Sequence, residues 1–467
     1  MALILRKKIL LFPVETTVRE LDFRLILGIL VTRPDWQILV GEHQLLFKLS
    51  LRLRNVVSVL KNVTGGKRPW KYRRWKELNH RIIHLDEEGA IYEQGPERWK
   101  IDLNNRLIVP ELDANDHVCT WGTFQADHYR SLNPACSANI NAVGHPRFDL
   151  SGPAFDALYQ EEARQLRERH GKFILVNTNI LASNVTGRDV YFRFYGISPE
   201  DTVARTHYIE HYCHEAQREA AFIELINHLS NTCPEHQIVF RPHPSEDLRA
   251  YEVLLKYIPR VTITRNGSLH AWLRSCQVLV HDGCTTAIEA HLGNTPVINF
   301  HPIHDPRFEI TLPNLVGIAC STPAEVADAI MEIDHGCSRA ITPPDHLDRL
   351  TLMIRNLDPS WDSFAEFAKI IRRCQDETAD AQLVGTLPPL GWHRFTDPLR
   401  RSTSIQKAIK PFLSQSQRGN NKFPPFDPDE IRNKLNLLEP ILGVSADVHF
   451  HSSMLLSLTS RESTPSR

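Results

Sequence analysis

Short apolar runs alternate with longer amphipathic segments along most of this chain. The short runs are rich in β-branched and aliphatic residues, as buried parallel strands are. They lie at residues 8–15, 36–43, 81–89, 117–122, 139–147, 172–179, 237–244, 260–265, 277–283 and 295–302. Amphipathic stretches at 211–232, 246–257, 268–275 and 285–292 predict helices between the later strands. This alternation is typical of βαβ units and predicts an α/β protein with parallel sheets.

The strands fall into two successive sets, which predict two doubly wound, Rossmann-like domains facing a cleft. The segment GHPRFDLSGP at 144–153 is the expected hinge, so we place the first domain at 1–145 and the second at 146–345. Bracing helices are expected at 346–378, and the Pro- and Ser-rich remainder, 379–467, is expected to be a partly disordered helical and irregular extension. Ligands of such sheets bind beyond the carboxyl ends of the strands, so the cleft is the expected binding place.

Charge and cysteine usage narrow the possible partners and compartment. The formal net charge of −1 argues against a protein that binds nucleic acid with its whole surface. The nine cysteines are scattered without a CxxC pair, which favours a reducing cytoplasm. The N-terminus reads as a first strand instead of a signal peptide, and no apolar run is long enough to span a membrane. We therefore expect a cytoplasmic protein that meets a membrane only from its surface.

Three acids and a glycine, DEEG, follow the strand RIIHL. Adjacent like charges raise one another's pKa and favour a group that can accept a proton. A solvated turn bent by Gly89 would contain the same residues. The sequence leaves both interpretations open for Asp86, Glu87 and Glu88.

The segment RPHPSED stands where the run QIVF ends and a helical pattern begins. Proline stiffens the backbone on both sides of His243, because the residue before a proline is kept out of the helical region. A pre-set imidazole near a helix start can donate to a phosphate, and Arg241 can add a fork-shaped donor. A surface loop histidine is the alternative.

A second strand end carries anion-binding potential, in HDGCTTAIEAHLG. Asp282 and Gly283 end the strand, and Thr285 and Thr286 open a helix whose free amides and hydroxyls form a ready phosphate site. The structural alternative is N-capping by Asp282 or a threonine, and Glu289 stands at capping-box spacing from Thr286. Both interpretations are compatible.

Residues 48–76 are rich in Lys and Arg and contain no acid, with aromatic residues interleaved. Such a segment fits an anionic membrane face or a phosphate-bearing acceptor. A single-stranded nucleic-acid platform has a similar composition, but the neutral chain leads us to expect no nucleic-acid partner. An exposed basic helix without a partner is the remaining alternative. The residues expected on this surface are Arg68, Trp70, Lys71, Arg73, Arg74 and Trp75.

Several metal-like patterns are discounted. His207, His211 and His214 have helical spacing but no HExxH signature, and the group His301, His304 and Asp305 is a weaker case. The DxD formed by Asp427 and Asp429 lies in the Pro-rich tail, and neither GxGxxG nor a P-loop is present. We expect no metal and no cofactor.

Together these motifs resemble bacterial glycosyltransferases of the GT-B fold that act in surface-carbohydrate biosynthesis. The resemblance covers residues 8–335. Bacterial sialyltransferases and capsule Kdo transferases, which use CMP-sugars, carry an acidic-acidic-Gly motif in the first domain and a His-Pro motif in the second. In this chain those look like Glu87-Glu88-Gly89 and His243-Pro244.

The resemblance implies an acceptor-side first domain and a nucleotide-donor second domain. Glu87 would be the catalytic carboxylate, with Glu88 and Gly89 shaping its turn, while Arg241 and His243 would contact the donor phosphate. A third set would hold phosphate and nucleotide, namely Pro244, Asp282, Gly283, Thr285, Thr286 and Glu289. The implied activity is transfer of an acidic sugar, Kdo or sialic acid-like, from a CMP-sugar to a glycan or lipid-linked glycan acceptor, at the inner membrane surface.

Two other functions stay open. The CDP-glycerol glycerophosphotransferases of teichoic acid synthesis share the RPHP turn and the Thr-bearing helix start, and transfer a polyol phosphate. A non-catalytic GT-B-fold partner in a polysaccharide assembly complex would keep the sheets and lose the site chemistry. DEEG, with its extra acid Asp86, favours sugar transfer without excluding the others.

Overall fold

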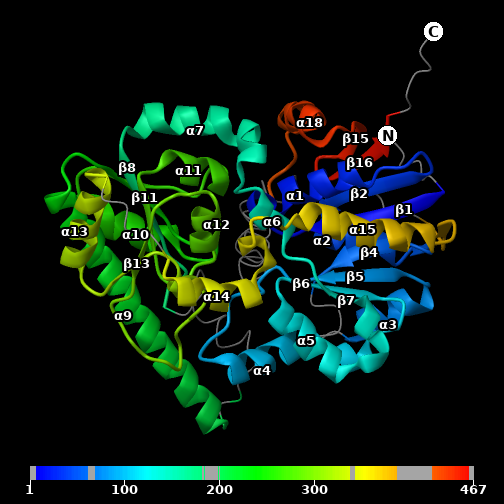
Figure 1. Ribbon diagram of the computed structural model, residues 1–467, viewed down its shortest axis with the longest axis horizontal. Coiled ribbons are helices and arrows are strands. Elements are labelled where there is room, and N and C mark those ends of the chain that lie inside the picture. The colour runs from blue at the N-terminus through cyan, green and yellow to red at the C-terminus, as the bar shows by residue number, and fades with distance from the viewer. Residues whose placement is uncertain are drawn as a thin grey trace, which may run out of the picture. The chain divides into compact units, whose positions relative to one another are not determined.

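The computed structural model describes residues 7–61, 69–180, 183–184, 198, 200–336, 342–386 and 423–461. The chain divides into two compact units (Figure 1). Unit 1 comprises Met1–Gly89, Lys100–Leu150 and Leu352–Arg467, and unit 2 comprises Ala90–Trp99 and Ser151–Thr351.

Unit 1 is built on an eight-stranded sheet with the order β15-β16-β2-β1-β4-β5-β6-β7. Six strands are parallel: β1 (Lys8–Val14), β2 (Trp36–Glu42), β4 (Val57–Leu60), β5 (Arg81–Leu85), β6 (His117–Thr120) and β7 (Ile140–Ala142). All seven residues of β2 are buried, which explains why Ile38, Leu39 and Val40 are apolar in succession in place of strict alternation.

Helices flank this sheet. They are α1 (Thr17–Leu30), α2 (His43–Ser50), α3 (Pro69–Glu77), α5 (Thr123–Leu132), α6 (Pro146–Asp149), α15 (Ser363–Asp376) and α18 (Pro428–Leu442), while α4 (Pro96–Arg106) begins in unit 2. Helix α15 forms because its apolar residues recur at helical spacing, and it begins where the Asp362 carboxylate caps the amide of Ala365. The return of α15 brings a distant part of the chain into unit 1.

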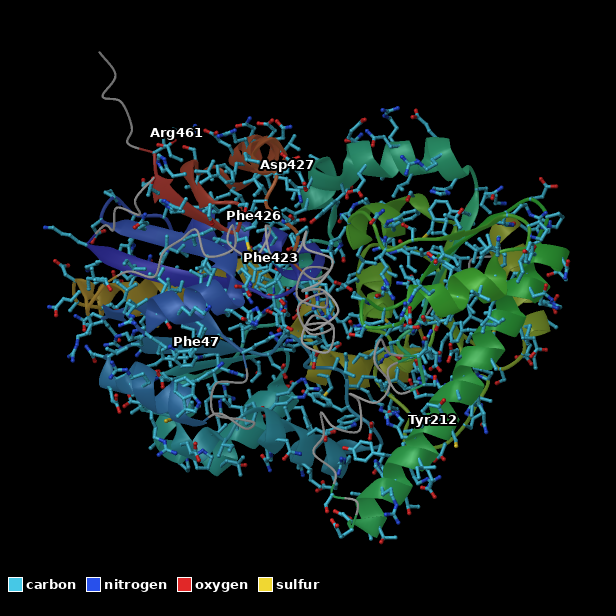
Figure 2. The ribbon with its side chains drawn as sticks, turned by 180° about the vertical axis from the view of Figure 1, so that it is seen from behind. Phe47, Tyr212, Phe423, Phe426, Asp427 and Arg461 are labelled. Atoms are coloured by element: carbon cyan, nitrogen blue, oxygen red, sulfur yellow. The ribbon has the colours of Figure 1, made fainter. Side chains whose placement is uncertain are left out.

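The end of the chain completes the sheet of unit 1. A hairpin, β15 (Ala446–Ser452) and β16 (Leu455–Ser460), pairs antiparallel with β2. Arg461 ties the hairpin to α18 through ion pairs with Glu439 and Asp447 (Figure 2). Leu458 is fully buried, and its side chain lies against Gly28, where an added Cβ would come within 2.6 Å of it. The sequence analysis did not predict this hairpin.

Unit 2 is built on a six-stranded parallel sheet with the order β10-β9-β8-β11-β12-β13. Its strands are β8 (Phe173–Asn177), β9 (Gln237–Arg241), β10 (Val261–Ile263), β11 (Val278–His281), β12 (Val297–Phe300) and β13 (Ile318–Cys320). Numbered from the first strand of the unit, this order is 3-2-1-4-5-6, the order of a doubly wound Rossmann sheet. The direction of winding reverses between β8 and β11.

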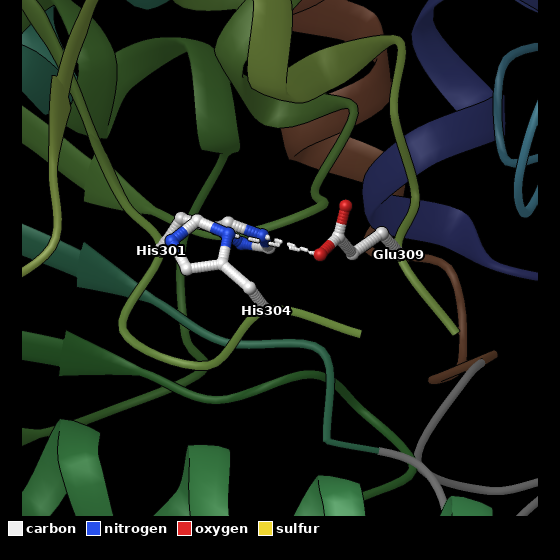
Figure 3. Close-up of side chains that lie close together, drawn as sticks. All are labelled: His301, His304 and Glu309. Carbon is white, nitrogen blue, oxygen red and sulfur yellow. Dashed lines mark ion pairs between the residues drawn. The ribbon is translucent and has the colours of Figure 1, made fainter. Parts of the chain in front are cut away.

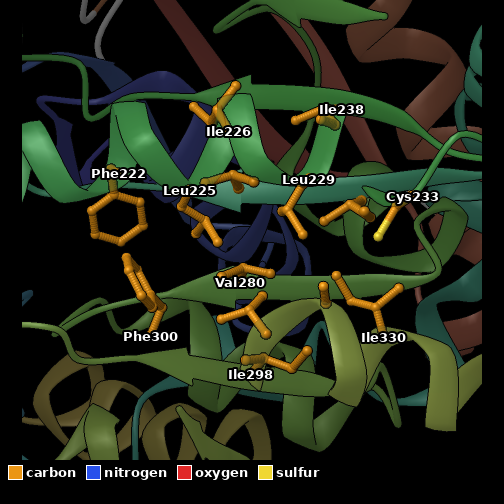
Figure 4. Packing of buried hydrophobic residues seen from close by; sticks show 14 of the residues in the cluster. Phe222, Leu225, Ile226, Leu229, Cys233, Ile238, Val280, Ile298, Phe300 and Ile330 are labelled. Carbon is orange, nitrogen blue, oxygen red and sulfur yellow. The ribbon is translucent and has the colours of Figure 1, made fainter. Parts of the chain in front are cut away.

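The helices of unit 2 are α7 (Asp156–His170), α9 (Thr202–Thr232), α10 (Leu248–Leu255), α11 (Leu269–Ser275), α12 (Thr286–Leu292) and α13 (Pro323–Asp334), and α14 (Pro344–Met353) follows them. Their apolar faces cover the sheet. Phe222, Leu225 and Leu229 of α9 belong to one buried cluster with Val280 and Phe300 of the sheet (Figure 4). The close packing of this buried cluster holds the strands of unit 2, and therefore their ends, in fixed positions.

These two doubly wound units confirm the expected α/β, GT-B-type fold class. The expected helical and irregular C-terminal extension is only partly right, because β15 and β16 join the sheet of unit 1. The strand β4 was missed because its short run VSVL lies inside the basic segment 48–76. Among the residues that the structure describes, no helix combines the length and apolar character needed to cross a bilayer.

Candidate functional site

Polar side chains gather at the carboxyl end of the unit 2 sheet, on both sides of the reversal. Strand β8 ends in Asn177, and the next residues, Thr178 and Asn179, are also buried. On the other side, Asp282 and Gly283 follow β11. The Asn179 Nδ2 donates to the Gly283 carbonyl at 2.9 Å and ties the two strand ends together. Ligands of doubly wound sheets bind at this point, because the connections leave in opposite directions and open a crevice there.

Glu246 anchors the RPHP loop to the end of β8. Its carboxylate accepts hydrogen bonds from the His243 amide at 2.7 Å, from the Ile180 amide at 3.2 Å and from the Thr178 hydroxyl at 2.9 Å. The Tyr251 hydroxyl donates to the other carboxylate oxygen. Burial raises the pKa of Glu246 to about 7, although these hydrogen bonds act in the opposite direction. The sequence analysis quoted this residue in RPHPSED but gave it no role.

The side chains of the RPHP loop make different contacts. The amide of Ser245 donates to His243 Nδ1 at 3.2 Å, so the neutral imidazole carries its proton on Nε2. Pro244 follows in the same turn, and its ring keeps the backbone of His243 extended. Arg241 donates to the carbonyls of Asn266 at 2.5 Å and Gly267 at 3.4 Å, and burial lowers its pKa to about 10. The Arg241 guanidinium therefore shapes the turn after β10.

Asp282 lies in a buried polar network. Arg218 of α9 donates to its carboxylate at 2.7 Å, and Asn314 Nδ2 donates to it at 2.8 Å. Burial by itself would raise the pKa of Asp282, but the charge of Arg218 and the hydrogen bonds of His301 and Asn314 hold it below its usual range. Asp282 is thus an ionised, buried group at the carboxyl end of β11.

The backbone conformation at position 283 requires a glycine. Its φ is +64°, and a Cβ there would come within 3.2 Å of Ile310 Cβ. Its amide donates to Asn314 Oδ1 at 2.6 Å. The left-handed turn lets the chain leave β11 and enter α12 close to Asn179.

The capping alternative for this helix start is wrong. Thr285 is the N-cap of α12, and it makes no side-chain cap bond. Thr286 is the first helical residue, so it does not form the capping box suggested by its spacing from Glu289, and Asp282 is committed to Arg218. Thr285, Thr286 and Glu289 are all buried.

In unit 1, Glu87 of the DEEG motif lies in a buried ionic cluster. Arg24 of α1 donates to its carboxylate at 2.8 Å, and His145 Nε2 lies 3.1 Å from the other oxygen. The Arg147 amide donates to His145 Nδ1, so Nε2 carries the proton and donates to Glu87. Burial would raise the pKa of Glu87, but His145, Arg24 and Arg147 outweigh it and hold that pKa below its usual range. In the same cluster, burial raises the pKa of Glu20.

The other residues of DEEG are arranged differently. The Glu88 side chain is 52% exposed and lies 3.3 Å from Arg106 Nη1. Asp86 is buried and accepts from the Glu88 amide at 3.0 Å. A Cβ at Gly89 would come within 2.7 Å of the Trp121 ring, whose Nε1 donates to the Asp86 carbonyl at 2.6 Å. The turn is therefore packed on its Gly89 side and open at Glu88.

The basic segment forms only part of the expected surface. Trp70 is 51% exposed, Arg73 is exposed, and the Lys71 ammonium lies 4.2 Å from the Phe47 ring centre. Trp75 is 7% exposed and donates to the Ser50 hydroxyl at 2.8 Å, so its expected place on the surface is wrong. Arg68 lies outside the described residues.

A pocket of about 590 Å³ opens between α2 and α3. Its lining residues are Lys48, Leu51, Arg52, Trp70, Arg74 and Glu77. Three cationic side chains, one of which pairs with Glu77, stand beside an indole and suit an anionic group attached to an apolar body.

The histidines that were discounted as metal ligands in the sequence lie in two different environments. The rings of His207, His211 and His214 pack against Phe308, with centroid distances of 5.1–5.4 Å. His301 and His304 instead meet Glu309 (Figure 3). Asp305 pairs with Arg307. In the tail, Asp427 caps α18 by accepting from the Asp429 amide.

Sequence reasoning missed several residues that build these sites. Arg24 and His145 hold Glu87, while Arg218 and Asn314 hold Asp282. His145 stands in the segment GHPRFD, where a histidine before a proline was the available signal. The others carry no local signal, since their partners lie far away in the sequence.

Comparison with known proteins gives one family match. Residues 197–337 match a family model described as LIC12162 family transferase. This segment contains β9 to β13, including the RPHP loop and the ends of β11 and β12. The match supports a transferase. No curated protein matches the chain.

Several solved structures are similar to this chain at low identity. The wall teichoic acid polymerase TagF has 11% identity and a TM-score of 0.43, covering 79% of this chain and 90% of that chain. UDP-GlcNAc 2-epimerase from Methanocaldococcus jannaschii has 13% identity and a TM-score of 0.46, covering 78% and 99%. HepE from Anabaena has 11% identity and a TM-score of 0.39, covering 78% and 100%.

Proposed function

We propose that this protein is a glycosyltransferase of surface-polysaccharide synthesis that transfers an acidic sugar, Kdo or sialic acid-like, from a CMP-sugar to a glycan acceptor. The observation that carries the proposal is the reversal of strand order in unit 2, with buried polar groups at both adjoining strand ends. A nucleotide donor would bind at that edge. The transferase family match, which includes β11 and the RPHP loop but not β8, supports this assignment.

In this proposal His243 stabilises the departing nucleotide phosphate. Its tautomer places a donor on Nε2, and its amide is held by Glu246, so the imidazole is oriented before the donor binds. Such a preoriented donor lowers the barrier because it need not reorganise as charge develops on the leaving phosphate. Arg241 and Pro244 act as positioning residues. The nucleotide would lie beside the residues that follow β11 and begin α12, namely Asp282, Gly283, Thr285, Thr286 and Glu289.

Glu88 is our proposed base. A base must reach the acceptor hydroxyl, and the exposed Glu88 carboxylate is better placed for that than Glu87, which is buried between Arg24 and His145. The lowered pKa of Glu87 also weakens it as a proton acceptor. In this proposal Glu87 fixes the conformation of the turn through Arg24 and His145, and Gly89 packs against Trp121. The family resemblance implies the opposite roles, with Glu87 as the catalytic carboxylate and Glu88 shaping the turn.

The basic face of α3 is our proposed acceptor or membrane surface. Trp70, Lys71, Arg73 and Arg74 remain from the expected set, and Trp70 and Arg74 line the pocket beside α2. A lipid-linked glycan would bring a phosphate to the cations and an apolar body to the indole.

The proposal is tested first by thermal stabilisation of the purified chain with CMP, CDP, UDP and GDP. A ligand that binds only the native state adds about 2.7 kcal/mol at a concentration of 100 Kd. We expect CMP to raise Tm most, and Gly283→Ala to remove the shift while the exposed control His335→Gln keeps it. A preference for CDP would replace the proposal with polyol-phosphate transfer, a preference for UDP or GDP with another sugar donor, and no shift with a non-catalytic protein.

The roles of the two acids are tested by turnover. With a CMP-sugar and acceptor that support transfer, Glu88→Gln should lower kcat by at least 10²-fold, the usual contribution of a general base, with little change in Tm. Glu87→Gln should lower Tm. Full activity in Glu88→Gln would overturn its assignment as the base.

A further inference from the structure

One cluster of metal-ligating side chains plays no part in the proposed transfer. His301 directly follows β12, and His304 and Glu309 belong to the loop after it. The ligand atoms of these three residues all lie within 4.8 Å of one another (Figure 3). His301 Nε2 is 3.2 Å from Glu309 Oε1, and His304 Nδ1 is 3.7 Å from the same oxygen.

These distances suit a shared ion. Zinc binds imidazole nitrogen and carboxylate oxygen at about 2.0–2.2 Å, so its ligand atoms lie about 3–4 Å apart. The His304 side chain is 63% exposed, while those of His301 and Glu309 are 13% and 23% exposed. His304 can therefore move the short distance that closes the set, whereas the other two are already held.

The second nitrogen of His301 has the partner that a metal-binding histidine requires. His301 Nδ1 lies 3.1 Å from an Asp282 carboxylate oxygen, and Asn314 Nδ2 donates to the same oxygen at 2.8 Å. Arg218 donates to the other oxygen of Asp282 at 2.7 Å. With Nδ1–H donating to Asp282, Nε2 faces Glu309 and would offer its lone pair to an ion that displaces the proton between them. A carboxylate that orients a histidine in this way is typical of metal sites and fixes both the tautomer and the ring.

The charges of this region also favour a cation. Within the described network, the carboxylates of Glu215, Asp282 and Glu309 accompany one guanidinium, that of Arg218. Three carboxylates and one guanidinium leave this partly buried place with excess negative charge unless an imidazole is protonated or a cation is bound. A divalent ion would neutralise that excess.

We infer that His301, His304 and Glu309 bind a divalent first-row transition-metal ion, with Zn²⁺ the best fit, and that Asp282 orients His301 for it. Two imidazoles and one carboxylate select such ions over Mg²⁺, which prefers oxygen ligands. Three protein ligands leave coordination positions for water or a phosphate oxygen at the carboxyl edge of the sheet. The inference is independent of the proposed sugar transfer.

Calorimetric titration of the chelator-treated full-length protein tests the inference. We expect one Zn²⁺ to bind per chain, Mg²⁺ to bind at least 10-fold more weakly, and Co²⁺ to produce visible absorption bands. His304→Gln and Glu309→Gln should each weaken Zn²⁺ binding by at least 10-fold, since loss of an orienting partner alone costs about 10–100-fold. His335→Gln, an exposed histidine at the end of α13, is the matched control and should bind like the wild type.

The two ligand variants change side chains that are exposed or partly exposed, so circular dichroism should confirm that they fold. Zn²⁺ binding that is absent from the wild type, equal to Mg²⁺ binding, or unchanged in both ligand variants would overturn the inference.

Discussion

Replacing Glu246 with glutamine tests whether this buried acid keeps a proton near neutral pH. Glutamine has the shape of the protonated acid. Its oxygen can accept from the amides of Ile180 and His243, and its amide group can donate to the hydroxyls of Thr178 and Tyr251. The variant should therefore fold and should lack only the titration.

The expected effect follows from the difference between the folded and unfolded pKa. Burial raises the pKa of Glu246 to about 7 from the ordinary value of 4.5, so the folded protein binds the proton more tightly than the unfolded chain. That extra stability is fully present below pH 4.5 and is lost as the pH rises through 7. Between pH 5 and pH 8 the wild type should lose about 2.5 kcal/mol that Glu246→Gln does not lose.

Urea denaturation of both proteins at several pH values between 5 and 8 measures this difference. Subtracting the two profiles cancels the titration of distant groups, because independent sites contribute additively. Glu332→Gln, at an exposed position of α13, is the matched control and should run parallel to the wild type. Parallel profiles for the wild type and Glu246→Gln would refute the reasoning, because they would mean that burial does not hold the proton on Glu246.

Three further substitutions test other parts of the structure, each by chemical denaturation. Arg218→Met should cost about 3–5 kcal/mol, because it leaves two buried carboxylates without their cation; a loss below 1 kcal/mol would contradict this. Gly283→Ala should destabilise more than Gly336→Ala, since both glycines have positive φ but only Gly283 has a close neighbour, Ile310; equal losses would show that crowding is unimportant. Leu458→Ala should cost about 2–5 kcal/mol because its side chain is fully buried, and an unchanged stability would mean that the hairpin does not support the sheet.

Local sequence pattern was sufficient for most of the secondary structure. The expected strands were found because each consists of a short apolar run, and the expected helices of unit 2 were found because helical periodicity extends over two or more turns. The pattern was insufficient for β4 and β13, which are short, and for β15 and β16, whose polar residues resemble those of an irregular tail.

The candidate site was only partly predictable. Asp282 and His243 could be placed at the carboxyl edge of a sheet because each follows an apolar strand, and parallel strands end at the same edge. The environment of Glu87 could not be foreseen, because Arg24 and His145 are 63 and 58 residues away from it in the sequence. Trp75 was misplaced for a similar reason, since its partner Ser50 belongs to another helix.

The sequence by itself determined most of the strands and helices, the α/β class and the residue types at the strand ends, because these depend on periodicities within a few residues. Only the tertiary structure decided which strands are neighbours, and hence where the winding of unit 2 reverses. It also decided which acids are buried and with which cations they pair. Those properties depend on contacts between residues distant along the chain, and burial, charge and hydrogen bonding at such contacts are what shift a pKa and assemble a binding site.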